Sequence, residues 1–210
     1  SESAHTITVQ GAAAYTSTAQ KKWGTASLYT EGTSCIYVAG SNNATDSNDY
    51  FNFGTRDYTI ECWARSNTTG NNEEYIFSKW GSGVSQTDPY WVQFTRSNMS
   101  TGYNIQMPAS VANHYIVTST SFWSVNTWYW IAVAREGSTT SFWVDGTRVG
   151  TVTDSDAIST HANPYFTIGA GYSTSSGPSY VHQGYIDDFR VSSVARYSGA
   201  SITVPTAALG

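Results

Sequence analysis

The sequence predicts an all-β protein in which two antiparallel sheets pack face to face and helix is nearly absent. Short runs of β-branched and aromatic residues recur along the chain, separated by clusters of Gly, Asn, Ser and Thr. No long stretch places apolar side chains at the spacing of an amphipathic helix. The many short strands favour a two-sheet sandwich, and we expect one such domain over residues 1–210.

Turn-forming residues bound each predicted strand. The predicted strands are His5–Val9, Ala26–Thr30, Cys35–Val38, Tyr58–Arg65, Tyr75–Lys79, Tyr90–Thr95, Tyr103–Gln106, Tyr115–Thr118, Trp128–Arg135, Ser141–Val144, Arg148–Thr153, Tyr165–Ile168 and Tyr180–Val191.

The run Tyr58–Arg65 predicts a strand with one buried face. Because side chains alternate along a strand, Tyr58, Ile60, Cys62 and Ala64 share one face, which we expect to be the core face. Cys62 is therefore expected in the interior. The only other cysteine is Cys35, and the pair forms either two buried free thiols or a single bridge.

Two further segments carry sharp structural signals. Trp128–Arg135 is apolar or aromatic on both faces up to its last residue, which predicts a central strand covered on both sides. Asp145 and Gly146 lie between two alternating runs, and Asp-Gly suits the two positive φ angles of a type I′ turn. The sequence therefore predicts a hairpin at this pair.

Composition excludes several kinds of partner. Charged residues make up only 12% of the chain and the net charge is -5, with lysine at positions 21, 22 and 79 alone. That pattern offers no basic stripe for a phosphate backbone, so we expect no nucleic-acid partner. No apolar run approaches the roughly 20 residues of a membrane-spanning helix, so no membrane insertion is expected.

Five sequence blocks, in order, resemble the LamG-like jelly-roll pattern of the concanavalin A-like lectin/glucanase superfamily. They are Tyr58–Arg65, Trp128–Arg135, Phe142–Gly146, Thr167–Gly171 and Gly184–Val191. The resemblance implies a jelly-roll sandwich of the concanavalin A-like type. It leaves function open, because the superfamily includes lectins, glycosidases, laminin and pentraxin modules and display domains.

The two ends of the chain support a finer resemblance. Thr16–Gly24, Ala26–Tyr29 and Val194–Tyr197 before Pro205 are similar to LamG-like domains in structural proteins of marine bacteriophages. This resemblance implies a place on a virion surface or tail fibre, or otherwise an extracellular location. Its expected partners are cell-surface glycans, other virion or extracellular structural proteins, and further copies in a homo-oligomer.

The carboxylates do not form the pattern of the related glucanases. Retaining glycosidases need two carboxyl groups about 5–5.5 Å apart, which alternate positions of one strand help to supply. Glu73 and Glu74 are adjacent and so face opposite ways, as do Asp187 and Asp188. The sequence therefore predicts no enzyme activity and no catalytic residue.

Asp187 is expected on the core face of its strand, in phase with Phe189 and Val191, although Ile186 blurs the assignment. A carboxylate that leans towards a core needs a partner. The sequence allows two kinds of partner for this carboxylate: either an Arg or backbone N–H group, or a structural calcium ion. Resemblance to laminarinase-type enzymes implies calcium at Asp187, with further oxygens from Glu31 and Gly32.

Aromatic residues in or beside predicted loops are the candidate glycan-binding residues, because exposed rings stack on sugar rings while polar neighbours bond hydroxyls. They are Trp80, Tyr90, Trp91, Trp123, Tyr172 and Tyr180, with His182 beside them. Aromatic residues in sandwiches are often core residues instead. The leading hypothesis is a non-catalytic, lectin-like adhesion module. The alternatives are a display or capsid-decoration domain without a ligand, and a glycoside hydrolase.

Overall fold

The computed structural model describes most strands of the chain together with their connections. It describes residues 6–12, 14–39, 51, 53–68, 74–78, 93–96, 103–107, 114–117, 124–153, 155, 165–173 and 177–209, some of them by backbone alone. Within these ranges every regular element is a strand and none is a helix. No helical segment in the described ranges has the length and apolar character that crossing a membrane requires.

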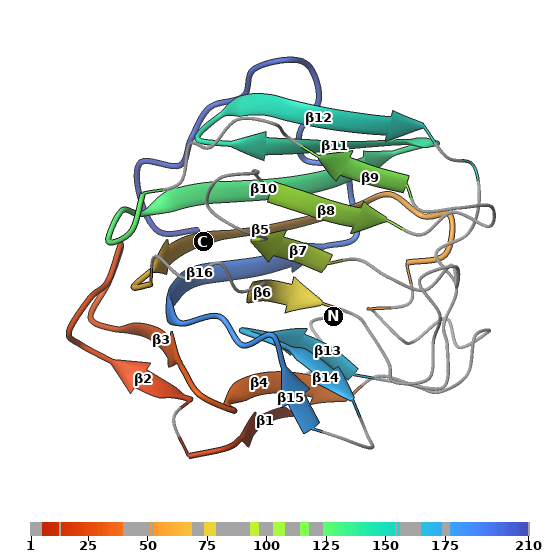
Figure 1. Ribbon diagram of the computed structural model, residues 1–210. Helices are drawn as coiled ribbons and strands as arrows, with labels where there is room; N and C mark the ends of the chain where they lie inside the picture. The colour runs from red at the N-terminus through yellow and green to blue at the C-terminus, as the bar shows by residue number, and fades with distance from the viewer. Residues whose placement is uncertain are drawn as a thin grey trace.

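Two antiparallel sheets of seven strands each form the two layers, which confirms the predicted fold class (Figure 1). Sheet B, at the back of Figure 1, has the order β12-β11-β10-β5-β16-β3-β2. Its strands are β2 Tyr15–Ser17, β3 Ser27–Thr30, β5 Tyr58–Ser66, β10 Tyr129–Glu136, β11 Thr139–Val144, β12 Thr147–Thr153 and β16 Gly184–Ser192.

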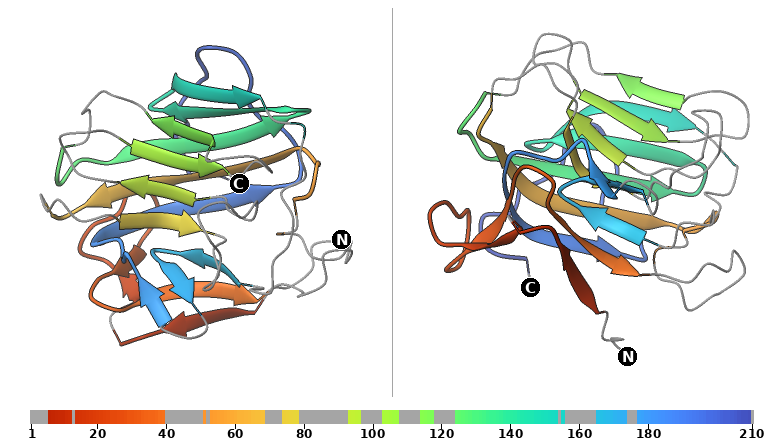
Figure 2. Two further views of the ribbon diagram at one scale, coloured as in Figure 1. Left: turned by 45° about the vertical axis from the view of Figure 1, so that its right-hand side comes forward. Right: turned by 60° about the horizontal axis from the view of Figure 1, so that its bottom comes forward.

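Sheet A lies in front and has the order β1-β4-β13-β6-β7-β8-β9. Its strands are β1 Ile7–Gln10, β4 Cys35–Ala39, β6 Glu74–Ser78, β7 Gln93–Arg96, β8 Tyr103–Met107, β9 His114–Val117 and β13 Tyr165–Ile168. A small two-stranded sheet pairs β14 Gly171–Ser173 with β15 Gly177–Ser179. The strands nearest the N-terminus, β1 to β4, gather at one end of both layers (Figure 2).

The main core fills the space between the two sheets. Alternation along β5 turns Tyr58, Ile60, Cys62 and Ala64 inward, and all four are fully buried, as predicted. Phe166 of β13 packs against the same cluster from the opposite sheet. Both cysteines are buried free thiols, and burial raises the pKa of the Cys35 thiol to about 12.

The predictions for the strands after residue 128 are largely confirmed. Strand β10 is buried along its length except at Glu136 and lies between β5 and β11. The hairpin turn between β11 and β12 has φ of 45° at Asp145 and 80° at Gly146. The Asp145 carboxylate also accepts the backbone N–H of Trp130 at 2.8 Å, which ties the turn to the start of β10.

The prediction of one continuous strand Tyr180–Val191 is wrong. Strand β16 begins only at Gly184; before it, Tyr180 has a left-handed φ of 53°, and Val181 forms only an isolated bridge with Tyr75. The short strands β2, β14 and β15 were not expected, because runs of three residues carry too little periodicity to be recognised.

The expected orientation of Asp187 is also wrong. A bulge at Asp188, with φ of 53°, inserts one extra residue between Asp187 and Arg190. Asp187 therefore lies opposite Trp63 on the outer face of sheet B, whereas Phe189 and Val191 pack against the core. The bulge explains why alternation read across this strand is ambiguous.

The C-terminal segment, residues 193–209, runs along the outer face of sheet B, behind it in Figure 1. It pairs with the β11–β12 hairpin, since Ile202 donates its N–H to Gly146 O and Arg148 donates its own to Ala200 O. A side chain at Gly146 would meet the Ile202 carbonyl at 2.5 Å, so this close approach requires glycine.

Candidate functional site

The outer face of sheet B carries several aromatic side chains that lie outside the main core. Along β5 the residues that alternate with the buried set are Glu61, Trp63 and Arg65. Directly opposite on β16 lie Asp187 and Tyr185. These positions share one face, which points away from sheet A.

Three tyrosines and their neighbours line up across the strands at one end of this face. Tyr15 of β2 lies opposite Tyr29 of β3, Tyr29 lies opposite Tyr185 of β16, and Tyr185 lies opposite Arg65 of β5. Trp128, which precedes β10, lies at the far end with its ring 6.5 Å from that of Tyr185. We call these five residues the aromatic row.

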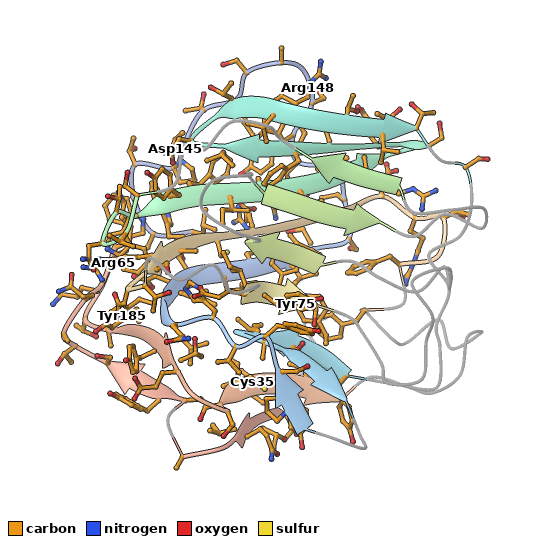
Figure 3. The ribbon with its side chains drawn as sticks, in the orientation of Figure 1. Cys35, Arg65, Tyr75, Asp145, Arg148 and Tyr185 are labelled. Atoms are coloured by element: carbon orange, nitrogen blue, oxygen red, sulfur yellow. The ribbon has the colours of Figure 1, made fainter. Side chains whose placement is uncertain are left out.

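Ring contacts hold the aromatic row together. The ring centres of Tyr15 and Tyr29 are 5.3 Å apart, and those of Tyr29 and Tyr185 are 4.9 Å apart. The Arg65 guanidinium lies 5.5 Å from the Tyr185 ring centre, and Figure 3 shows the two side chains next to each other. Tyr15 is 50% exposed and the other members are partly exposed, so the row presents rings to solvent.

Polar side chains run beside the aromatic row on the same face. Glu31 and Asn67 each follow a row residue by two positions, and Gln183 precedes Tyr185 by two. Asn67 donates its N–H to Gln183 O at 2.8 Å, so these two residues are neighbours across the ladder. We call Glu31, Gln183 and Asn67 the polar row.

Hydrogen bonds connect the two rows. The Tyr29 hydroxyl donates to Glu31 Oε2 at 2.6 Å, and this bond raises the pKa of Tyr29 above its usual range. Arg65 Nη1 donates to Asn67 Oδ1 at 2.5 Å, and Arg65 Nε donates to Asn126 O. The rings and the polar groups are thereby held in fixed relative positions on one surface.

The other half of the outer face is covered. Trp63, Trp130 and Trp143 are buried there in one cluster, which the C-terminal segment joins with Tyr197, Ile202 and Val204 and the turn before β3 joins with Trp23. The Tyr197 and Trp130 rings meet edge to face at 5.3 Å, and Trp143 Nε1 donates to Gly199 O. These indoles are core residues of a second, smaller cluster.

Glu61 fixes the C-terminal segment to the sheet. Its carboxylate is fully buried and accepts a bond from Arg190 Nε at 3.0 Å and one from the Tyr197 hydroxyl at 2.8 Å. Burial, followed by the bond to Glu61, raises the pKa of Tyr197 to about 12. A buried acid with two donors is a structural group here.

A shallow pocket of about 190 Å³ lies where the C-terminal segment meets β10, β11 and β12. It is lined by Ala134, Glu136, Thr139, Ser141, Arg148, Tyr197, Ser198 and Gly199. It is smaller than the roughly 300 Å³ at which small-molecule sites usually begin. The aromatic row is therefore the stronger candidate.

Asp187 lies at the border between the two halves, with backbone partners. Its Oδ2 atom accepts the N–H groups of Lys22 at 2.7 Å and Trp23 at 3.0 Å. The Lys22 ammonium lies 3.7 Å from the Trp63 ring centre, so the turn containing Lys22 and Trp23 closes over that indole. Of the two partners that the sequence left open for this acid, the structure provides the backbone N–H groups.

The residues predicted to bind calcium do not come together. The ladder pairs Thr30 with Gly184, which puts Glu31 four positions from the residue facing Asp187, about 13 Å along the strands. Calcium ligands lie about 2.3–2.6 Å from the ion, so Asp187 and Glu31 do not fit one site. No cluster of three His, Cys, Asp or Glu that could hold a metal occurs in the part of the chain that the structure describes.

Of the predicted ligand-binding residues, four lie outside the described residues: Trp80, Tyr90, Trp91 and Trp123. Tyr172 contributes backbone to β14, and its side chain is not described. Tyr180 is 46% exposed and stacks on Tyr75 with the two planes 18° apart.

His182 is placed in the interior. It is fully buried, with Nδ1 3.0 Å from Glu74 Oε2, while Thr30 donates its hydroxyl to the His182 carbonyl. Thr68 donates to the other carboxylate oxygen of Glu74. The Nε2 atom is buried and has no partner among the described residues. A side chain in this position holds β6 to the start of β16 and does not reach an external ligand.

Sequence reasoning did not identify the aromatic row. Tyr15 and Tyr29 lie on consecutive strands, but Tyr185 is more than 150 positions away, and only strand pairing makes the three neighbours. The sequence pattern that could have indicated the row is a tyrosine two positions from a polar residue at the end of a strand, as in Tyr29 and Glu31. Each such pair alone is too common to single out.

Comparisons with known proteins agree with this architecture. A family model described as the concanavalin A-like lectin/glucanases superfamily matches residues 39–200. A search of curated proteins by sequence found no match.

Several solved structures share the fold. Domain 4 of an extracellular arabinanase from Geobacillus stearothermophilus, in complex with arabinotriose, is 15% identical, with a TM-score of 0.61 over 91% of this chain and 82% of that one. The binding domain of Paraclostridial Mosquitocidal Protein 1 is 14% identical, with a TM-score of 0.64 over 92% and 45%. A putative carbohydrate binding protein from Bacteroides ovatus is 16% identical, with a TM-score of 0.53 over 77% and 42%.

Proposed function

Because this chain belongs to the concanavalin A-like lectin/glucanase superfamily, we propose that it binds carbohydrate, without cleaving it, through the aromatic row. The observation that carries the proposal is the line of three contacting rings, Tyr15 exposed and Tyr29 and Tyr185 partly exposed, beside the polar row. Rings stack on the apolar faces of sugars, while amide and carboxylate groups bond their hydroxyls. Among proteins of this fold, an arabinanase domain in complex with arabinotriose and a putative carbohydrate binding protein support the choice of ligand.

Binding to immobilised linear polysaccharides tests this proposal. We expect retention on at least one of cellulose, xylan, arabinan, laminarin and chitin, and we expect Tyr185→Ala to remove it because the central ring of the row is lost. Tyr165→Ala is the matched control, since Tyr165 is a partly exposed tyrosine that packs on Tyr37 on sheet A. Wild-type protein that passes every matrix unretained would overturn the proposal.

A rival surface at Tyr180 is tested in the same assay. Its ring is exposed and stacked on Tyr75, an arrangement that also suits a sugar. We expect Tyr180→Ala to retain binding, because Tyr180 lies outside the aromatic row. Loss of binding in Tyr180→Ala together with full binding in Tyr185→Ala would move the site to Tyr180.

The non-catalytic part of the proposal rests on the acids of β16. Asp187 accepts two backbone N–H bonds and Asp188 accepts the N–H of Leu209 at 2.7 Å, so both carboxylates have structural partners. We expect no release of reducing sugar from any polysaccharide that the protein binds. Sustained release by wild-type protein would show that it is an enzyme.

The proposed setting is an extracellular assembly, with the surface or tail fibre of a bacteriophage virion as the specific case. A single flat aromatic site binds weakly, and display in several copies compensates through avidity. We expect the protein, arrayed on beads, to bind bacterial cells and to lose them after periodate oxidises their surface sugars. Binding that survives periodate would point to a protein receptor.

A further inference from the structure

The aromatic row has a direction and a length that restrict its ligand. It crosses β2, β3, β16 and β5 at right angles to the strands, with one row residue on each. Neighbouring strands lie about 4.8 Å apart, so the four members of the row that lie on these strands, from Tyr15 to Arg65, span about 14 Å. The ring spacings of 5.3 and 4.9 Å repeat this step. One sugar ring covers about one strand, so three tyrosines offer places for three consecutive sugars.

The surroundings of the row differ on its two sides. On one side lies the polar row, with Glu31 and Asn67 exposed. On the other side lie Ser27, whose hydroxyl donates to Gln20 O, and Asp187, whose carboxylate is bonded to the turn at residues 22–23. A ligand therefore meets open hydrogen-bonding groups along one edge only.

Among the described residues no strand of sheet B lies beyond Tyr15, because β2 is the edge strand of that sheet. Tyr15 is half exposed there, and a chain can continue past it. A site that is open at its end can recognise an internal segment of a polymer in place of a chain end.

Charges next to the row are balanced. Glu31 and Asp187 are acidic, and Arg65 and Lys22 are basic. Each is already engaged, since Glu31 accepts from Tyr29, Asp187 accepts backbone N–H groups, and Arg65 and Lys22 lie over aromatic rings. This pattern gives a polyanion no excess of positive charge to neutralise.

We infer that the aromatic row selects an extended, unbranched and uncharged glycan that lies across the strands and covers at least three consecutive sugars. This inference rests on the proposed function and specifies the ligand of the same site. Branches on the face towards the protein would lift the sugars from the rings, and anionic sugars would meet Glu31 without a free cation.

A length series tests the inference by isothermal titration calorimetry. The probes are xylo-, cello-, arabino- and chito-oligosaccharides of one to six units, with oligogalacturonides as the anionic series. For the series that binds, we expect affinity to rise roughly fivefold per unit up to three or four units and then to level off. We also expect less than a twofold change in affinity between 50 and 500 mM NaCl.

Tyrosine-to-alanine variants show which ring of the row accounts for the affinity gained with each added sugar. Tyr15→Ala should remove the gain from the third or fourth sugar while leaving the shortest bound oligosaccharide within twofold of wild type. Tyr185→Ala should weaken every length by roughly tenfold, because its ring is central. Tyr165→Ala is again the control, and circular dichroism spectra and melting temperatures confirm that each variant is folded.

Different negative results would overturn the inferred type of glycan and the proposed carbohydrate binding. Equal affinity for all lengths, tightest binding of oligogalacturonides, or loss of binding when the chain termini are blocked would overturn the inference while leaving carbohydrate binding intact. No binding of any series by wild-type protein would overturn the proposed function as well. Binding that Tyr180→Ala removes and Tyr185→Ala spares would place the ligand elsewhere.

Discussion

The outer face of sheet B has two halves with similar composition and opposite environments. In the covered half, Trp130 and Trp143 are fully buried beneath the C-terminal segment. In the open half, the rings of Tyr29 and Tyr185 contact one another at a tilt of 47° and are partly exposed. Trp63 and Arg65 are only two residues apart on β5, yet one belongs to each half. A segment distant in sequence therefore decides whether an aromatic side chain is core or accessible surface.

The largest expected contrast comes from matched truncations in the two halves. Trp130→Ala should lower the free energy of unfolding by about 3–5 kcal/mol, because it removes a fully buried indole and leaves a cavity. Tyr185→Ala should cost about 1 kcal/mol, because its ring is already partly in water. Urea denaturation measures both values. Similar costs for the two variants would show that the open half is also covered in solution.

The second contrast concerns the buried acid that fixes the covering segment. Glu61→Gln should cost about 2–3 kcal/mol, because Arg190 keeps its charge while its buried partner loses one. Tyr197→Phe removes only the second donor and should cost about 1 kcal/mol. In a double-mutant cycle followed by thermal melting, we expect the two changes to be non-additive. Additive costs would show that the three side chains do not act together.

The third test concerns Asp187 at the border of the halves. Asp187→Ala should cost about 1–2 kcal/mol, because two backbone N–H groups lose their acceptor. Calcium at this residue stays a prediction from the sequence. The melting temperature measured with 5 mM calcium chloride or with EDTA tests whether Asp187 binds calcium in addition to the backbone N–H groups. Since the backbone already satisfies the bonded carboxylate oxygen, we expect both additions to leave the melting temperature unchanged. A rise with calcium that Asp187→Ala abolishes would assign a metal to this site.

The smallest expected effect is the pH dependence that Tyr197 contributes in the covered half. The pKa of Tyr197 is raised from 10.0 to about 12, so its contribution is fully present below pH 10. It is lost as the pH rises from 10 through about 12, because the unfolded chain then gives up this proton first. The stability gap between wild type and Tyr197→Phe should therefore narrow above pH 10. A gap that stays constant from pH 8 to 11 would contradict the bond to Glu61.

The strands show how far sequence patterns reach. In β5 and β10 the long alternating or doubly apolar runs predicted the position of each strand, the core face of β5 and the burial of β10, but not the burial of Glu61 and Trp63 on the second face of β5. Along β16 the same reasoning failed, because the strand does not extend back to the left-handed Tyr180 and a bulge at Asp188 reverses the alternation. Neither irregularity has a glycine to mark it, and both depend on contacts with other strands.

The candidate site was harder to predict than the fold for a related reason. Loop aromatics such as Tyr180 stand out in a sequence because they interrupt polar segments. Tyr15, Tyr29 and Tyr185 sit within strands, where tyrosine is ordinary. Their significance comes from cross-strand register, which brings residues more than 150 positions apart into contact distance.

The sequence by itself determined the fold class, the core face of β5 and the Asp145-Gly146 hairpin, because periodicity and turn chemistry are local properties. Only the tertiary structure decided which aromatic residues are accessible. The C-terminal segment covers Trp130 and Trp143, and no comparable segment among the described residues covers Tyr15, Tyr29 and Tyr185. Burial depends on what packs above a face, and no local pattern encodes that contact.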